Sequence, residues 1–275
     1  MTKDEIVIKS KSDFKLLDIK ELWRYRELLY IFTWRNLKIR YKQTMLGILW
    51  VLLQPLLSTF IFTVFFGNIL KIKSGGIPYP LFVLTGLVYW TFFSNALSQS
   101  SMSLITNAGI LQKIYFPRII IPLSMVLTSF IDFLIAFIML LIFALFLGYI
   151  PNIWFFLVFP LTIFVSVITA SGLGFFLSSI NIKYRDVTYI VPYFIQIMLF
   201  VTPIIYPFSI VGERNRFLMS LNPMSSVIEF SRFMFFDKYF IVPSLSILSV
   251  IISIIIFISG LWYFNKTEKY FADVV

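Results

Sequence analysis

Two long stretches of this sequence contain no charged residue, and they limit what the chain can fold into. One runs from Ser74 to Gln112, and the other runs from Phe133 to Ile182. A helix that crosses a bilayer needs about 20 mostly apolar residues, so each stretch can hold one crossing and part of a connection. The chain is 59% hydrophobic and 13% charged, whereas roughly a quarter of the residues in a soluble domain are charged. The sequence therefore predicts an all-α integral membrane protein and excludes a soluble enzyme.

Apolar runs of spanning length predict six transmembrane helices. Glycine and proline separate the runs, as at Gly75-Gly76 and at Gly148, because these residues favour turns. The fifth run carries Pro192 and Pro203, which disfavour a continuous helix. The predicted spans are residues 45–70, 81–105, 119–148, 154–180, 188–210 and 241–264.

The positive charge of the chain predicts its orientation. The formal net charge is +10, and an even number of spans places both termini on one side of the membrane. That side collects most of the 23 Lys and Arg residues, and cytoplasmic loops carry an excess of these residues. We therefore expect residues 1–44 and the tail 266–275 to be cytoplasmic.

Two segments read as helical without being spans. Residues 18–42 carry a charged stripe with aromatic residues such as Trp23 and Trp34 on other faces. This pattern predicts an amphipathic helix in the cytoplasmic interface, or simply an anchor on the lipid surface. Residues 211–240 are mixed in polarity, and Asn222-Pro223 predicts a turn between two short outer helices.

Asp132 is the one ionisable residue well inside a predicted span. An ionised carboxylate near mid-bilayer costs roughly 2.5–3.5 kcal/mol on insertion scales, so it needs a partner or a cavity. Asp132 is therefore hydrogen-bonded within the helix bundle, lines a hydrated pathway, or couples transport to protons.

The sequence lacks several kinds of catalytic and binding motif. It contains no His and no Cys, which excludes imidazole or thiolate metal sites and His-based triads. A P-loop pattern is also absent from the sequence, so the chain does not itself bind ATP in that way.

Four sequence segments, in fixed order, resemble the permease subunit of ABC-2 type exporters of polysaccharide or polyol phosphate, the group that exports O-antigen, capsule or teichoic acid. The resemblance covers about residues 20–265. The segments are residues 40–50 (RYKQTMLGILW), 111–118 (LQKIYFPR), 181–187 (NIKYRDV) and 221–224 (LNPM).

The resemblance implies a half-transporter of the bacterial inner membrane that works as a homodimer with two copies of a separate ATPase subunit. Residues 45–265 would form the six-span domain, with a coupling segment at 107–118 and re-entrant gate helices at 211–240. ATP and Mg²⁺ would bind to the ATPase, and this chain would need no cofactor, metal or nucleic acid. The implied substrate is a polysaccharide on undecaprenyl pyrophosphate, which is moved outward from the cytoplasm. The chain would also contact membrane lipid.

The resemblance places the ATPase contact in the short loop between the second and third spans. Its apolar side chains between cations suit docking into a groove, although an ordinary positively charged loop is the alternative. The candidate contact residues are Lys113, Ile114, Tyr115, Phe116, Pro117 and Arg118.

Cations just before the first span are candidates to bind the pyrophosphate of the substrate, because arginine grips phosphate in a bidentate way. General attraction to anionic phospholipid would also explain them. The candidates are Arg35, Arg40, Tyr41 and Lys42.

Aromatic rings in the spans could provide a wall along which sugars stack, although packing between helices or contact with lipid is the commoner role of such rings. Ser171-Gly172-Leu173-Gly174 predicts close helix packing. The candidate channel-lining residues are Tyr89, Trp90, Asp132 and Tyr193.

Other functions stay open on the sequence alone. The nearest is an ABC-2 permease for a small hydrophobic drug or a lipid. A membrane enzyme would need a catalytic cluster, which the sequence does not offer. A proton-coupled carrier would depend on Asp132.

Overall fold

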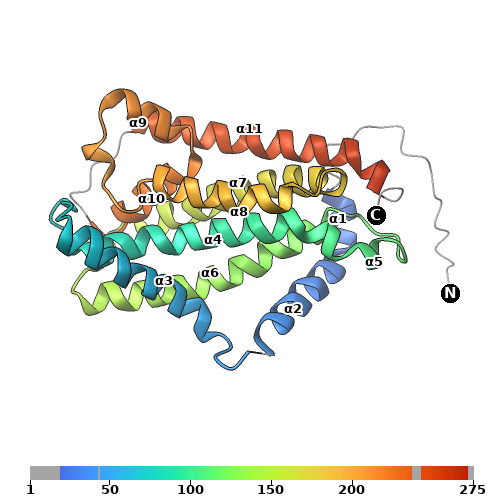
Figure 1. Ribbon diagram of the computed structural model, residues 1–275, viewed down its shortest axis with the longest axis horizontal. Helices are drawn as coiled ribbons and strands as arrows, with labels where there is room; N and C mark the ends of the chain where they lie inside the picture. Colours follow the sequence, from blue (N-terminus) through green and yellow to red (C-terminus); the bar gives the residue numbers. More distant parts are fainter. Residues whose placement is uncertain (1–18, 43, 237–242, 272–275) are drawn as a thin grey trace.

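The computed structural model of the protein describes residues 19–42, 44–236 and 243–271. Every regular element in these residues is a helix, and the long helices run roughly side by side (Figure 1). The first half contains α1 (Ile19–Arg24), α2 (Arg26–Lys42), α3 (Leu49–Phe62), the π-helical turn η1 (Thr63–Ile69), α4 (Tyr79–Thr106), α5 (Ala108–Leu111) and α6 (Ile120–Phe146). The second half contains α7 (Phe155–Lys183), α8 (Val187–Val201), η2 (Phe208–Ile210), α9 (Glu213–Ser220), α10 (Pro223–Phe233), α11 (Pro243–Thr267) and η3 (Glu268–Tyr270).

Five helical segments of the described residues are long and apolar enough to cross a membrane. They agree with five of the six predicted spans, so these five predictions are confirmed as helices of spanning length. The segments are Leu49–Ile69, Tyr79–Thr106, Ile120–Phe146, Phe155–Lys183 and Ser246–Thr267.

The predicted fifth span, residues 188–210, differs from the structure. Helix α8 covers only Val187–Val201 and is too short to count among the five. Thr202 is extended, with φ −77° and ψ 138°, because the ring of Pro203 disfavours the helical conformation in the residue before it. The chain then turns, so the helix of the fifth predicted span ends at Val201. Six complete crossings stay a prediction.

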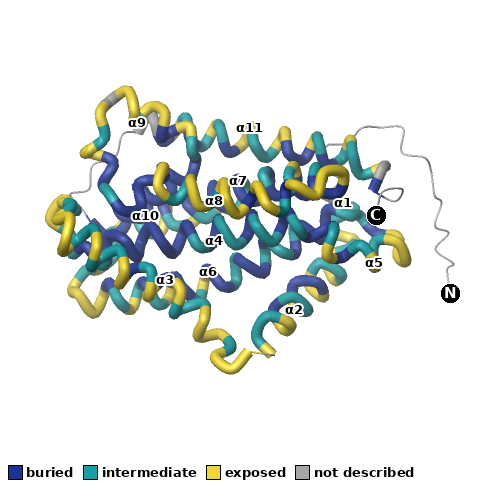
Figure 2. The backbone as a smooth tube through the Cα atoms, viewed as in Figure 1, coloured by how far each residue is buried: buried dark blue, intermediate teal, exposed yellow. Residues whose placement is uncertain are grey.

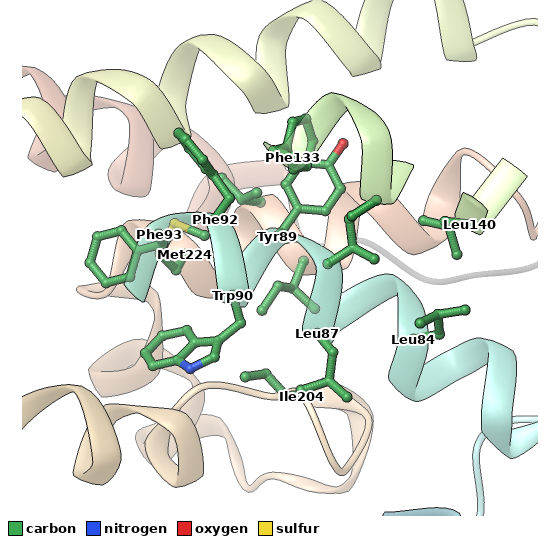
Figure 3. Close-up of a cluster of buried hydrophobic side chains, with 14 of the residues drawn as sticks. Leu84, Leu87, Tyr89, Trp90, Phe92, Phe93, Phe133, Leu140, Ile204 and Met224 are labelled. Atoms are coloured by element: carbon green, nitrogen blue, oxygen red, sulfur yellow. The ribbon is translucent and has the colours of Figure 1, made fainter. Parts of the chain in front are cut away.

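Helix α4 forms the centre of the bundle and contacts α6, α7, α3, α8 and α10. Burial is almost continuous along its first half, from Leu81 to Trp90. Figure 3 shows Tyr89 beside Phe133 of α6 within this apolar cluster, and their ring centroids are 4.9 Å apart. Helix α3 lies at the periphery and exposes apolar side chains such as Leu57 and Phe60, as Figure 2 shows by its yellow and teal segments.

Helices α7 and α11 approach each other through glycine. A Cβ atom at Gly172 would overlap the backbone of Phe257, and one at Gly260 would overlap the backbone of Gly172 itself. The predicted close packing at residues 171–174 is confirmed, because only a residue without a side chain fits between these two helices.

The two short helices predicted in residues 211–240 are present as α9 and α10, with the predicted turn between them, and their place on the outer side of a membrane stays a prediction. Asn222 caps α10, and its side-chain oxygen accepts a hydrogen bond of 3.1 Å from the backbone nitrogen of Met224. Helix α10 is buried on nearly all sides and packs against α4, α7 and α11. Residues 237–240 of the predicted gate segment lie outside the described residues.

The helices at the start and end of the described chain meet at one end of the bundle. Helix α1, helix α5 and the last turn of α11 lie there, whereas α9 and α10 lie at the opposite end (Figure 1). This arrangement agrees with termini on one side of a membrane, and the cytoplasmic assignment stays a prediction. Residues 1–18 and 272–275 of the two predicted cytoplasmic segments lie outside the described residues.

The predicted amphipathic helix forms two pieces, α1 and α2, with a break at Tyr25. Helix α2 packs against α6 and buries Phe32, Thr33 and Leu37. Trp23 and Trp34 stay exposed. One side of α2 therefore belongs to the protein core, and its placement at a lipid interface remains a prediction.

Candidate functional site

The last turn of α2 reaches the middle of α6, and there it surrounds the carboxylate of Asp132. One oxygen of Asp132 accepts a hydrogen bond from Nη1 of Arg40, with which it forms an ion pair. The other oxygen accepts a hydrogen bond from the hydroxyl of Tyr41. Two residues predicted to bind phosphate thus contact a residue predicted to line the channel, although 91 or more residues separate them in the sequence.

A third donor of this cluster is also engaged. The second terminal nitrogen of Arg40, Nη2, donates to the side-chain oxygen of Gln99 on α4. Burial raises the pKa of the Tyr41 phenol, and the hydrogen bond to Asp132 raises it further. Tyr41 therefore stays protonated and donates to the carboxylate. The cluster joins α2, α4 and α6 through one carboxylate and one guanidinium.

A cavity of about 330 Å³ opens beside the cluster. The carboxylate and the guanidinium lie at its wall, polar side chains continue along α4 and α6, and apolar side chains complete it. Its lining residues are Arg40, Tyr41, Thr44, Gly47, Trp50, Val51, Gln54, Val88, Thr91, Phe92, Asn95, Gln99, Ser129, Asp132, Phe133 and Ala136.

A second cavity, of about 390 Å³, lies on the other side of Arg40. Arg40 and Gln99 line both cavities, so their hydrogen bond forms part of the partition between them. The other lining residues are Arg35, Asn36, Ile39, Met102, Thr106, Asn107 and Met125.

The two cavities follow one face of α4. Residues 88, 91, 95, 99, 102 and 106 line one cavity or the other, and their spacing of three or four residues keeps them on one side of a helix. The cavities therefore form one groove along α4, divided where Arg40 meets Gln99.

Arg35 and Lys42, the other two cations predicted to bind phosphate, have different environments. Arg35 donates to the side-chain oxygen of Asn107 at 2.6 Å and lies over the ring of Phe32, with 4.9 Å between the guanidinium carbon and the ring centroid. Burial lowers the pKa of the Arg35 guanidinium. Lys42 is exposed. Arg35 thus connects α2 with the end of α4 and also lines the second cavity.

The predicted ATPase contact separates into an exposed and a buried part. Ile114 and Tyr115 project from the loop, and Tyr115 is 85% exposed. Lys113 is exposed as well. Phe116 was predicted as an apolar surface residue, but it is 4% exposed and packs against Phe32 of α2 with ring centroids 5.6 Å apart.

The end of the same loop is held by the C-terminal turn. Pro117 is partly buried. The backbone nitrogen of Arg118 donates to the carboxylate of Glu268 at 3.1 Å, and the Arg118 side chain donates to the backbone oxygen of Glu268. Arg118 also lies over the ring of Phe271. The loop therefore connects α2 and the end of α11 as well as α4 and α6.

The three aromatic channel candidates also differ in exposure. Tyr89 and Trp90 are buried in the core of the chain; the Tyr89 hydroxyl lies 3.0 Å from that of Thr162. Neither ring presents a face to the surface of a single chain. Tyr193, on α8, is 67% exposed.

Two functional candidates were missing from the sequence prediction, Gln99 and Asn107. Both lie in the uncharged stretch from Ser74 to Gln112. A neutral amide side chain gives a weaker sequence signal than a charged one. The helical spacing of Thr91, Asn95 and Gln99 would have indicated a polar stripe on the second predicted span.

Known proteins resemble this chain along most of its length. The family model described as ABC-2 type transporter matches residues 27–236. The chain is 33% identical to the O-antigen export system permease protein RfbA of Klebsiella pneumoniae over 90% of this chain and 95% of that protein. A protein of the same description from Myxococcus xanthus is 28% identical over 80% of this chain and 84% of its own length. The polysialic acid transport protein KpsM of Escherichia coli is 23% identical over 72% of this chain and 77% of its own length.

Proposed function

The chain belongs to the ABC-2 type transporter family and is a permease of an ABC polysaccharide exporter, and we propose from that premise that it forms a channel for a lipid-linked, O-antigen-like polysaccharide. The observation that carries this proposal is the similarity to O-antigen export permeases along 90% of the chain. The substrate we propose is a glycan attached through pyrophosphate to undecaprenol. It moves from the cytoplasmic leaflet outward.

The energy for this movement comes from ATP hydrolysed on a separate ATPase subunit, of which two copies bind a homodimer of this chain. Exposed Ile114, Tyr115 and Lys113 suit insertion into a groove of that ATPase. Phe116, Pro117 and Arg118 then hold the loop against α2 and the C-terminal turn, so that a push on the loop moves both. The loop lies on the cytoplasmic side together with both termini.

The phosphate-binding role that we propose belongs to the groove along α4. Arg35 lines its second cavity and Arg40 lines both, and a guanidinium can bind two oxygens of one phosphate. Tyr41 adds a hydroxyl donor. Lys42, exposed at the end of α2, adds positive charge that draws anionic headgroups toward the groove.

The polymer itself follows a path between the two copies of the chain. Exposed apolar and aromatic side chains on α3 and α8 support this arrangement, Tyr193 among them. Tyr193 offers the polymer a ring face and a hydrogen-bonding edge. Tyr89 and Trp90, buried in α4, act by supporting the wall of the path.

Reconstitution with the ATPase tests this function. The two subunits are purified as a complex, placed in proteoliposomes with an undecaprenyl-pyrophosphate-linked glycan, and supplied with ATP and Mg²⁺. We expect ATP-dependent transfer of the glycan across the bilayer. Transfer of small lipids or hydrophobic drugs without transfer of the glycan would contradict the proposal and favour a permease for small molecules.

A further inference from the structure

Asp132 and a phosphate group would compete for the same donors. Nη1 of Arg40 and the hydroxyl of Tyr41 both point at the carboxylate of Asp132, and the same two donors would bind an oxyanion of a ligand in the cavity. A carboxylate in an apolar helix normally needs a fixed counter-charge. Here the pair lines a cavity, and the side chain of Arg40 is 27% exposed. The pair is therefore not sealed among helices.

We propose that Asp132 is an exchangeable counter-ion: it neutralises Arg40 and accepts the hydrogen bond of Tyr41 when the groove is empty, and a phosphate group of the substrate takes its place when the groove is loaded. This inference rests on the proposed function, since it specifies how the groove binds and releases an anionic headgroup. The class of ligand is a lipid-linked diphosphate, which in the proposed substrate also carries the glycan on its second phosphate. No covalent bond forms or breaks in this exchange, which replaces one set of hydrogen bonds with another.

The position of Arg40 gives the exchange a consequence for the groove. Its second nitrogen holds Gln99, and these two residues divide the groove into its two cavities. A phosphate that binds Arg40 from the second cavity reorients the guanidinium and opens the partition. Return of Arg40 to Asp132 then expels the phosphate, because the two anions repel each other across a short distance in a poorly screened environment.

A groove without Asp132 would bind phosphate too well. Neutralisation of Asp132 removes both the repulsion and the competition, so the affinity for phosphate should rise while release becomes slower. A purely structural ion pair predicts the opposite, because its loss would loosen the donors and weaken binding.

The test measures equilibrium binding of farnesyl diphosphate, a short lipid diphosphate, to the full-length chain in phosphatidylcholine nanodiscs. We expect Asp132→Asn to tighten binding about tenfold or more, the size of effect produced by removal of one nearby like charge. The matched control is Asp186→Asn, the same substitution at an exposed position before α8, and it should leave the affinity unchanged. If Asp132→Asn does not fold, Asp132→Ser provides the same test.

A double-mutant cycle assigns the effect to Arg40. Arg40→Gln should weaken binding. In the Arg40→Gln background, Asp132→Asn should change the logarithm of the dissociation constant by less than half as much as it does in the wild-type chain. Wild-type binding by Arg40→Gln would overturn the phosphate role in the proposed function, and this inference with it. Weaker binding by Arg40→Gln together with unchanged or weaker binding by Asp132→Asn would overturn only the exchange.

Two further ligands identify the source of the phosphate. Inorganic pyrophosphate and phosphatidylglycerol are measured in parallel with farnesyl diphosphate. If Asp132→Asn tightens the binding of farnesyl diphosphate more than that of the other two ligands, the result supports a lipid diphosphate as the ligand of the groove. The same tightening for inorganic pyrophosphate or for phosphatidylglycerol supports exchange with a free diphosphate or a phospholipid headgroup. The absence of tightening for all three ligands would overturn the proposal.

Discussion

Arg232 and Arg40 each form an ion pair with a carboxylate of the same chain, and the surroundings of the two arginines differ. Arg232 of α10 has 0% exposure, and its guanidinium lies 3.5 Å from the ring centroid of Phe82. Its Nη1 donates to Glu229 at 3.0 Å, and its Nη2 donates to the backbone oxygen of Ile204 at 2.8 Å. Arg40 has an ion pair with Asp132 too, but it borders two cavities.

The comparison shows the same residue type in two different environments. Arg232 joins α10 to α4 and to the turn after α8 through partners that belong to the protein and have no access to a ligand. Arg40 bonds to Asp132 and Gln99 and has open space beside it. The burial of a charge therefore indicates a structural role when every partner is enclosed, and a binding role when the partner faces a cavity.

The largest effect should follow Arg232→Met. This substitution leaves the Glu229 carboxylate and the oxygen of Ile204 without the guanidinium, and breaking a buried pair on one side typically costs about 3–5 kcal/mol. We expect the yield of folded, membrane-inserted protein to fall sharply. Thermal unfolding of the detergent-solubilised chain measures the loss.

The control for this prediction is Arg214→Gln, at an exposed position of α9, which should unfold at the wild-type temperature. A stable Arg232→Met variant that has also lost transport would break the comparison, because Arg232 would then act in binding or gating.

Arg40→Gln should cause a smaller loss of stability and a larger loss of function. The neutral amide can still hydrogen-bond to Asp132, and the cavity gives the carboxylate access to water, so we expect about 1–3 kcal/mol. Export of the glycan should nevertheless fall to background. Thermal unfolding and surface glycan are measured on the same preparations, and a stability loss equal to that of Arg232→Met would remove the distinction between the two arginines.

Tyr115→Ala should have the smallest effect on stability. Tyr115 is exposed in the loop between α5 and α6, and surface substitutions usually change stability by less than about 0.5 kcal/mol. We expect uncoupling instead: the ATPase hydrolyses ATP, but export is lost. ATP hydrolysis and export by the reconstituted complex are the measurements, and unchanged export would contradict docking by this loop. The matched variant Phe116→Ala should destabilise the chain, since Phe116 packs against Phe32.

Local patterns in the sequence predicted much of the fold. Hydropathy located five helices of spanning length, Asn222-Pro223 marked the turn before α10, and Gly172 marked the contact with α11. The early end of α8 also had a local signal in Thr202-Pro203, but the apolar residues beyond it favoured a longer span. These features depend on neighbouring residues, so one sequence is enough to find them.

The contacts of the candidate site depend on residues far apart in the chain, and the sequence predicted its members without their pairing. Asp132 needed a partner, and Arg40 was available, yet no local spacing connects two residues that lie 92 positions apart. The burial of Phe116 and Arg232 had the same cause. Phe116 lies in a predicted loop and Arg232 in a predicted short helix, and each is covered by helices from elsewhere in the chain.

The most direct test of the account is the amount of glycan on the surface of cells that carry Arg40→Gln in place of the wild-type permease, with the permease level in the membrane matched. We predict that surface glycan is lost while the lipid-linked glycan accumulates inside the cell. Surface glycan at the wild-type level would contradict the account, because it would show that export does not need the arginine that divides the groove.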